Sequence, residues 1–342
     1  MILKLTFREE LLRRLHVLPA PLMDAFGSVL FGRALAVAAR AGFFEALREK
    51  SLSSADIARK TGFHIDGTRL LAESFVEGGY LKCSKGMFRL SAEGRKWLLA
   101  GSTHSIVNLL LYFGTLHRRW ISLEESLVDG RPTVPYYAMF DERAWETYVL
   151  GMRDLARFLL PRVIKRMCLP DGEARLLDVG GSHGLYAIEC CRRAPELKSV
   201  VLDFEQPLRV ASRLVAEAGM QERVHMLAGD ILRTEIPGEQ DLILLFNVIH
   251  GFTEDQNRTL LPCLIRALVP GGRMYVLDQM TGVKGASRLG RFLPLMVGLN
   301  LLNEIGGKAY TFADIARWCA GAASVKMRGL GLPGVGLVEI VR

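Results

Sequence analysis

The stretch Leu176-Leu177-Asp178-Val179-Gly180-Gly181-Ser182-His183-Gly184 decides the fold of this 342-residue chain. It predicts a buried β-strand that runs into a glycine loop and then into a helix. The glycines Gly180, Gly181 and Gly184 let the backbone approach a ligand closely, and the start of the helix offers unpaired N–H groups. The spacing G-x-G-x-x-G of a dinucleotide-binding loop is absent. The acid Asp178 directly before the loop instead suits a ligand whose adenosine and amino-acid ends both lie near the turn.

Short apolar runs alternate with helical patterns after this loop. Such alternation favours an α/β fold with a parallel sheet and helices on both faces. The expected strands are Arg175–Val179, Ser199–Asp203, Val224–Ala228, Leu242–Asn247 and Arg273–Asp278. The carboxyl ends of successive parallel strands meet in one crevice, so the residues at these ends are expected to share a site.

Acidic residues at the strand ends are candidate ligand groups. Asp203 ends the second strand, where a carboxylate can accept hydrogen bonds from both ribose hydroxyls. Asp230 follows the third strand, where a carboxylate can accept from an adenine amino group while Ile231 lies against the ring. One acid at a strand end is usually a solvated loop residue, and only the set predicts a site. The candidate cofactor-binding residues are Asp178, Gly180, Gly181, Gly184, Asp203, Gly229, Asp230, Ile231, Phe246 and Asn247.

Residues 1–102 have a winged-helix pattern. The stretch Ser53-Ser54-Ala55-Asp56 is expected to open a short helix with a serine as N-cap, and Gly62 ends this helix. A second helix and a β-hairpin follow before Gly101. Apolar residues from Leu30 to Ala41 share one helical face, which we expect to be buried against a second copy of the chain. The rest of the chain is expected to form a helical linker that lines the substrate site, at residues 103–168, and a cofactor-binding domain, at residues 169–342.

A resemblance to a known family emerges from the segment Leu245–Asp255, which follows the fourth strand and contains His250. Together with the glycine loop and the Pro-Gly-Gly turn in Leu268–Arg273, it resembles the caffeate- and hydroxyindole-type O-methyltransferases that use S-adenosylmethionine. Gly306–Lys308 matches a late glycine motif of that family. The resemblance covers nearly the whole chain. It implies a Rossmann-like class I methyltransferase domain preceded by a mainly α-helical winged-helix dimerisation domain.

The resemblance implies that His250 is a general base assisted by an acid at Asp278. A phenol, with a pKa of about 10, is mostly protonated at neutral pH, whereas methyl transfer needs an electron-rich oxygen. A histidine side chain can remove that proton, which is typically worth about 10²–10⁴-fold in rate. The chain departs from the family at Gly251 and Phe252, which replace Asp-Trp, and at Ala309, which replaces a second acid. These departures leave open methylation of carbon or nitrogen, or a relative that binds the cofactor without methylating.

Candidate substrate-binding residues come from two helices. Tyr148 and Met152 share a helix face and resemble an aromatic-and-methionine segment of the family, although a core stripe explains their spacing equally well. Asn300, Asn303 and Glu304 interrupt an otherwise apolar helix, and burying such groups unpaired costs about 1–3 kcal/mol each. These residues predict a site for a small, aromatic acceptor, whose identity no motif specifies.

Composition bears on compartment and partners. Half of the residues are apolar and 23% are charged, which indicates a large packed core. No apolar run reaches the about 18 residues that span a bilayer. Residues 1–15 lack the apolar stretch of a signal peptide and predict an amphipathic helix. The six cysteines contain no C-x-x-C pair, so we expect a reducing, cytoplasmic location and no metal site.

A DNA-binding regulator is the alternative from a different class. The net charge is +8, and the first hundred residues carry 16 Lys and Arg against 10 Asp and Glu. The candidate recognition helix, however, carries Asp66, Glu73 and Glu77 against Arg69 alone, and its acids would repel phosphate. We therefore expect a homodimeric enzyme of secondary metabolism with no nucleic-acid or membrane partner.

Overall fold

The computed structural model describes residues 6–15, 17, 21, 24–25, 27–133, 140–283 and 285–342. The chain divides into two compact units, Met1–His117 and Arg118–Arg342, and each has its own hydrophobic core. This division falls inside residues 103–168, the segment expected to be a helical linker, so the helices of that segment are shared between the two units. Across the described ranges, none of the helices has the length and apolarity that crossing a membrane requires.

The first unit is a helical domain with a small antiparallel sheet. Its elements are α1 (Phe7–Arg14), η1 (Gly27–Phe31), α3 (Gly32–Arg40), α4 (Phe43–Ala46), β1 (Leu52–Ser53), α5 (Ser54–Thr61), α6 (Ile65–Glu77), β2 (Leu81–Ser84), β3 (Met87–Leu90), α7 (Ala92–Trp97) and α8 (Val107–Arg119). The predicted hairpin is β2–β3, and β1 adds to it in the order β1-β3-β2. The predicted serine cap is Ser53, whose hydroxyl accepts a hydrogen bond from the Asp56 N–H.

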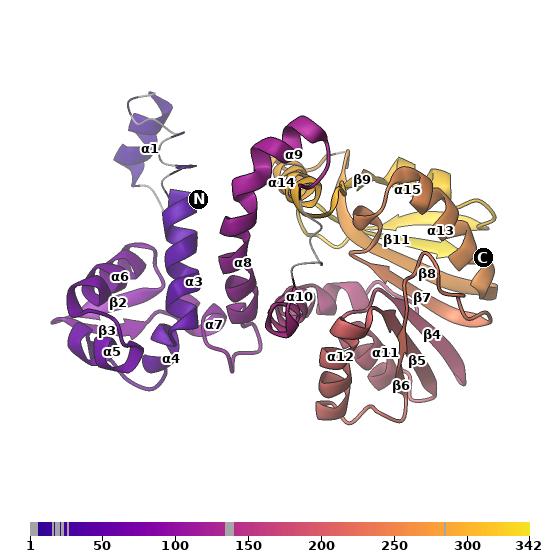
Figure 1. Ribbon diagram of the computed structural model, residues 1–342, viewed down its shortest axis with the longest axis horizontal. Coiled ribbons are helices and arrows are strands. Elements are labelled where there is room, and N and C mark those ends of the chain that lie inside the picture. Colours follow the sequence, from indigo (N-terminus) through magenta and orange to yellow (C-terminus); the bar gives the residue numbers. More distant parts are fainter. Residues whose placement is uncertain are drawn as a thin grey trace. The chain divides into compact units, whose positions relative to one another are not determined.

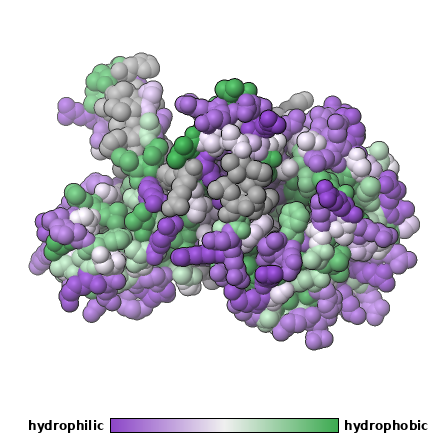
Figure 2. Space-filling model, in the orientation of Figure 1, coloured by the Kyte–Doolittle hydropathy of each residue, from purple (hydrophilic) through white to green (hydrophobic). Residues whose placement is uncertain are grey.

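Part of the apolar stripe from Leu30 to Ala41 packs into the core of the first unit itself. Ala38 is fully buried in the core of this unit, and Ala34 packs against that core. Leu30, at the other end of the stripe, is 52% exposed. Figure 2 shows hydrophobic residues mixed with hydrophilic ones on the visible face of the first unit.

The second unit is built on an eight-stranded sheet with helices on both faces (Figure 1). Before the sheet come η2 (Trp120–Ser122), α9 (Leu123–Asp129) and α10 (Glu142–Ile164). The sheet region contains β4 (Ala174–Val179), α11 (Leu185–Arg193), β5 (Leu197–Asp203), α12 (Glu205–Glu217), β6 (Val224–Ala228), β7 (Gln240–Phe246), η4 (Ile249–Gly251), α13 (Glu254–Ala267), β8 (Leu268–Thr281), α14 (Arg288–Ile305), β9 (Tyr310–Thr311), α15 (Phe312–Trp318), β10 (Ser324–Arg328) and β11 (Val335–Val341).

The five predicted strands are present as β4 to β8, and those that neighbour one another pair in parallel. The sheet also contains antiparallel strands: the strand order is β10-β11-β8-β7-β4-β5-β6, and β11 runs antiparallel to both β8 and β10. The eighth strand, β9, pairs in parallel with β8 outside this order. The two C-terminal strands were not predicted. They pair at the edge of β8 that β7 leaves open, so their place depends on the assembled sheet.

Alternate residues of each central strand serve two separate cores. Leu176 and Leu242 face the layer of α10, α11 and α12, whereas Leu177 and Ile243 face α13 and α15. Both faces are therefore covered, which explains why the strands are continuous apolar runs. β4 has β5 on one side and β7 on the other, so the sheet grows in opposite directions from this strand. A crevice for a ligand is expected at the carboxyl ends of the strands around such a point.

Candidate active site

A cavity of about 250 Å³ lies at the carboxyl ends of the central parallel strands. Tyr148 from α10 and His250 from η4 line this cavity together with six of the predicted cofactor residues. Those six are Gly180 after β4, Asp203 at the end of β5, Gly229, Asp230 and Ile231 after β6, and Asn247 after β7. The sheet thus brings residues separated by about seventy positions into one hollow, as the strand-end pattern predicts.

The glycine loop shapes the floor of this cavity. Gly180 has φ +67°, and a Cβ there would lie 2.5 Å from Cγ2 of Val248, so a side chain cannot be accommodated. Gly181 packs directly against the Asp178 carboxyl group, and Gly184 is the N-cap of α11. Of the predicted loop residues, Gly180 therefore forms the cavity surface, and the others form the support behind it.

Asp178 is a buried support for the loop and does not line the cavity. It is 1% exposed, and within the part of the chain that the structure describes its Oδ2 atom has no hydrogen-bond partner. Burial, with a smaller contribution from the charge of Asp203, raises its pKa to about 7. A cationic group near this loop would therefore favour the ionised form.

Asp203 is held toward the cavity by two backbone N–H groups. Its Oδ2 accepts from Ser182 at 2.9 Å and its Oδ1 from Phe204 at 2.7 Å. Burial raises the pKa of this carboxyl to about 6, and both hydrogen bonds oppose that rise. Each carboxylate oxygen retains capacity for a second hydrogen bond.

Asp230 is oriented in a similar way at the end of β6. Its Oδ1 accepts from the Leu232 N–H at 2.9 Å, and the exposed Arg233 places Nε 3.6 Å from Oδ2. Ile231 supplies an apolar surface beside it in the same cavity.

His250 forms a close pair with Asp278. The His250 Nδ1 atom lies 2.6 Å from Asp278 Oδ1, and the side chains are 15% and 2% exposed. The same carboxylate oxygen accepts the Gln279 N–H at 2.8 Å. With an ionised Asp278, Nδ1 carries the proton and the lone pair is on Nε2. The pair can therefore accept a proton from a ligand in the cavity.

The wall of the cavity is largely apolar. Trp145, Phe252 and Ile305 line it beside Tyr148, and none of these three was predicted as a site residue. The sequence contained a signal for Trp145, because it precedes Tyr148 by three residues and therefore shares its helix face. The predicted residue Met152 is absent from the lining and lies one turn further along α10.

The three polar residues of α14 have partners within the second unit and do not line the cavity. Trp120 Nε1 donates to Asn300 Oδ1 at 2.7 Å, and Asn300 Nδ2 donates to Glu304 at 3.0 Å. Arg119 pairs with Glu304 at 3.3 Å, and its carbonyl accepts from Asn303 Nδ2 at 3.1 Å. These bonds join α14 to Arg119 and Trp120, whereas the buried Oδ1 atom of Asn303 finds no hydrogen-bond partner among the described residues.

His183, in the glycine loop, is also a support. It is 7% exposed, and its Nδ1 accepts the Leu185 N–H at 3.0 Å. Burial, followed by the charges of Arg153 and Arg157, lowers its pKa to about 3. The imidazole is therefore neutral, and its Nδ1 atom is already used as an acceptor by the backbone at the start of α11.

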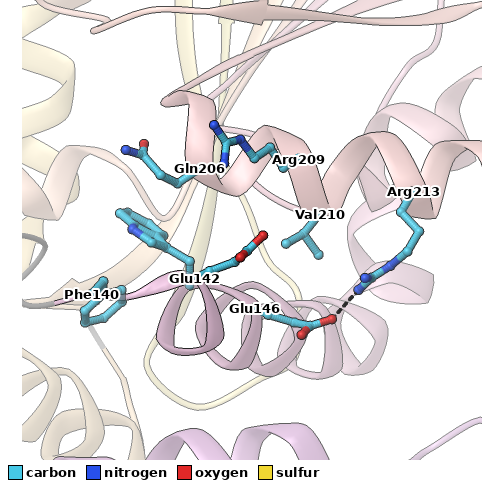
Figure 3. Close-up of a pocket in the computed structure, with 8 residues that line it drawn as sticks. Phe140, Glu142, Glu146, Gln206, Arg209, Val210 and Arg213 are labelled. Atoms are coloured by element: carbon cyan, nitrogen blue, oxygen red, sulfur yellow. Dashed lines mark hydrogen bonds and ion pairs between the residues drawn. The ribbon is translucent and has the colours of Figure 1, made fainter.

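A second, polar hollow of about 280 Å³ lies between α10 and α12 (Figure 3). Glu142 and Glu146 of α10 face Arg209 and Arg213 of α12, and Glu146 is ion-paired with Arg213. Trp145 contributes to both hollows. In this hollow the acidic residues of one helix face the basic residues of the other, whereas the predicted site residues line the other cavity.

Comparison with known proteins identifies the family. Residues 123–323, more than half of the chain, match the family described as the O-methyltransferase domain. The chain is 26% identical to the 3-hydroxy-5-methyl-1-naphthoate 3-O-methyltransferase of Streptomyces sahachiroi, over 92% of this chain and 93% of that protein. It is 25% identical to the L-tyrosine C(3)-methyltransferase of Streptomyces lavendulae, over 86% and 85%.

A solved structure shares the fold. Human N-acetylserotonin methyltransferase, crystallised with S-adenosylmethionine, superposes with a TM-score of 0.84 over 94% of this chain and 97% of that chain, at 22% identity. The α/β architecture expected from the sequence is thereby confirmed. The chain belongs to the O-methyltransferase domain family and is an S-adenosylmethionine-dependent O-methyltransferase.

Proposed function

We propose that the protein methylates a hydroxyl group of a small aromatic acceptor, with His250 as general base. The observation that carries this proposal is the 2.6 Å contact between His250 Nδ1 and Asp278 in a cavity that also contains the strand-end residues. The contact holds the imidazole in the tautomer whose Nε2 can accept a proton. The dyad supports a hydroxyl acceptor, because an alkylation at oxygen gains most from removal of a proton.

The methyl donor supplies an electrophilic methyl group on a sulfonium. Asp203 would accept from its ribose hydroxyls, Asp230 from its adenine amino group, and Ile231 would lie against the ring. The remaining lone pairs of Asp203 and the place of Gly180 in the cavity lining fit such a molecule. The proposed donor-binding set is Asp178, Gly180, Gly181, Gly184, Asp203, Gly229, Asp230, Ile231, Phe246 and Asn247.

The acceptor would lie against the apolar wall. Trp145, Tyr148 and Phe252 present aromatic surface to a flat ring, and Ile305 adds an aliphatic contact. The naphthoate acceptor in the name of one relative supports an aromatic compound of this kind. We assign Tyr148 to acceptor binding, whereas Met152, Asn300, Asn303 and Glu304 would act by supporting the helices around the cavity.

Methyl transfer would then need two contributions from the protein. The cavity would orient the acceptor hydroxyl for attack on the donor, which lowers the barrier as the methyl–sulfur bond breaks and the methyl–oxygen bond forms. His250 takes the hydroxyl proton, and Asp278 stabilises the imidazolium that results. Gly251 and Ala309 add no acid, so Asp278 is the carboxylate in contact with the base.

The test compares His250→Ala with the wild type, using labelled donor and a panel of phenolic metabolites. We expect kcat to fall by about 10²–10⁴-fold while donor affinity stays within about twofold, because the imidazole acts on the acceptor. Asp278→Asn should lower kcat less than the histidine change does. Mass spectrometry of the product should place the methyl group on oxygen. Near-normal turnover of His250→Ala, or a methyl group on carbon or nitrogen, would contradict the proposal.

A further inference from the structure

The loop that carries His250 is clamped by hydrogen bonds from three other parts of the second unit. It comprises residues 248–252, between β7 and α13. Within the loop, the Val248 carbonyl accepts the Gly251 N–H at 3.0 Å, and Ile249 is buried in the core. The carbonyls of Ile249, His250 and Phe252 each accept a further bond from outside the loop.

The first clamp is Asn257 on α13. Its side chain is fully buried, and Nδ2 donates to the Ile249 carbonyl at 2.9 Å and more weakly to the Phe252 carbonyl at 3.4 Å. The start of α13 does not need this amide, because Thr253 and Gln256 form a complete capping box there. The buried amide is thus directed at the loop.

The second clamp is Tyr310 on β9. Its hydroxyl donates to the Phe252 carbonyl at 2.6 Å, and its side chain is 3% exposed. The ring packs edge-on against Trp318, with centroids 4.7 Å apart. This packing fixes the direction of the hydroxyl.

The third clamp is the late glycine motif. The Lys308 N–H donates to the His250 carbonyl at 3.0 Å. A Cβ at Gly307 would lie 2.0 Å from that carbonyl oxygen, so the approach requires glycine. The motif therefore contacts the backbone of the histidine itself.

We propose that Asn257 and Tyr310 are positioning residues for methyl transfer. With the Gly307–Lys308 turn, they orient the carbonyls on both sides of His250 and so aim its ring at the acceptor. This inference rests on the proposed role of His250 as base. Displacement of a catalytic group by about 1 Å can cost up to about a hundredfold in rate, so loss of one clamp is expected to lower turnover without abolishing folding.

The test uses Tyr310→Phe, which keeps the ring packing and removes the hydroxyl alone, and Asn257→Leu, which keeps the volume. Tyr275→Phe is the control, because this buried tyrosine loses hydroxyl hydrogen bonds away from the loop: its hydroxyl donates to Glu339 at 2.7 Å and accepts the Cys168 N–H at 2.8 Å. We expect each clamp variant to lower kcat by about tenfold, with donor affinity within about twofold. The control should keep wild-type kcat.

The same changes in a His250→Ala background separate positioning from general damage. In the His250→Ala background, Tyr310→Phe should lower kcat no further, because the imidazole that Tyr310 is proposed to position is already absent. An equal loss in both backgrounds would overturn the inference, as would wild-type kcat in Tyr310→Phe. If only Tyr310→Phe keeps wild-type turnover while His250→Ala is impaired, the positioning role alone fails. If His250→Ala itself keeps normal turnover, the proposed base fails and the positioning role fails with it.

Discussion

At the residue scale, Asp203 links donor binding to pH. Burial raises the pKa of its carboxyl to about 6. Ribose hydroxyls would donate to the ionised carboxylate, so the donor binds that form better and lowers the pKa. Donor affinity is therefore expected to rise as pH increases from about 5 to about 7 and then to level off. Asp203→Asn should bind more weakly and show a flatter profile.

Isothermal titration calorimetry with S-adenosylhomocysteine at several pH values measures this dependence. The neutral demethylated sulfur removes the sulfonium charge from the comparison, so the profile reports on the carboxyl groups. If donor affinity rises with pH to the same extent in Asp203→Asn, the assignment of this pH dependence to Asp203 is contradicted. It would point instead to Asp178, whose pKa burial raises to about 7.

At the element scale, α10 faces two hollows, and only one is proposed to bind the acceptor. Glu146 on this helix pairs with Arg213 of α12, and both side chains are about half exposed. Such surface pairs contribute about 0.2–1 kcal/mol, so Arg213→Ala should lower Tm by no more than about 4 °C and leave the acceptor KM unchanged. Trp145→Ala, on the same helix, should raise the acceptor KM by about tenfold or more, since it removes part of the apolar wall.

Thermal melts and steady-state kinetics on the two variants check this prediction. The opposite result, with a raised acceptor KM in Arg213→Ala and a normal one in Trp145→Ala, would place the acceptor in the polar hollow of Figure 3.

At the scale of the whole molecule, we propose a two-fold dimer formed through the first unit. Leu30, at the free end of the predicted stripe, is 52% exposed. A charge there would oppose burial against a second copy, so Leu30→Glu should convert the dimer to a monomer. Leu70→Glu is the control, because Leu70 is 67% exposed on α6 of the same unit.

Light scattering at micromolar concentration distinguishes the two states. A wild-type protein that is already monomeric would refute the dimer. Dissociation by Leu70→Glu and not by Leu30→Glu would move the interface to another face of the first unit.

Local patterns were sufficient for much of the fold. The winged-helix pattern, the five central strands and the glycine loop each depend on a few adjacent residues, whose turn chemistry and apolar spacing operate within one element. The convergence of Asp203, Asp230 and His250 on one cavity was also predictable, because parallel strands of one sheet end at the same edge. The sequence by itself therefore determined that the parallel strands end at one edge of the sheet and which acidic and basic side chains lie there.

The tertiary structure decided what depends on neighbours far away in the chain. β10 and β11 joined the sheet because β8 had an open edge, and no local pattern encodes such an edge. The polar residues of α14 were predicted to meet a substrate, yet their hydrogen bonds go to Arg119 and Trp120, some 180 positions away. The clamps on the His250 loop are likewise contacts between separate elements. A sequence states which groups are polar, but only the packed chain decides which partner satisfies each of them.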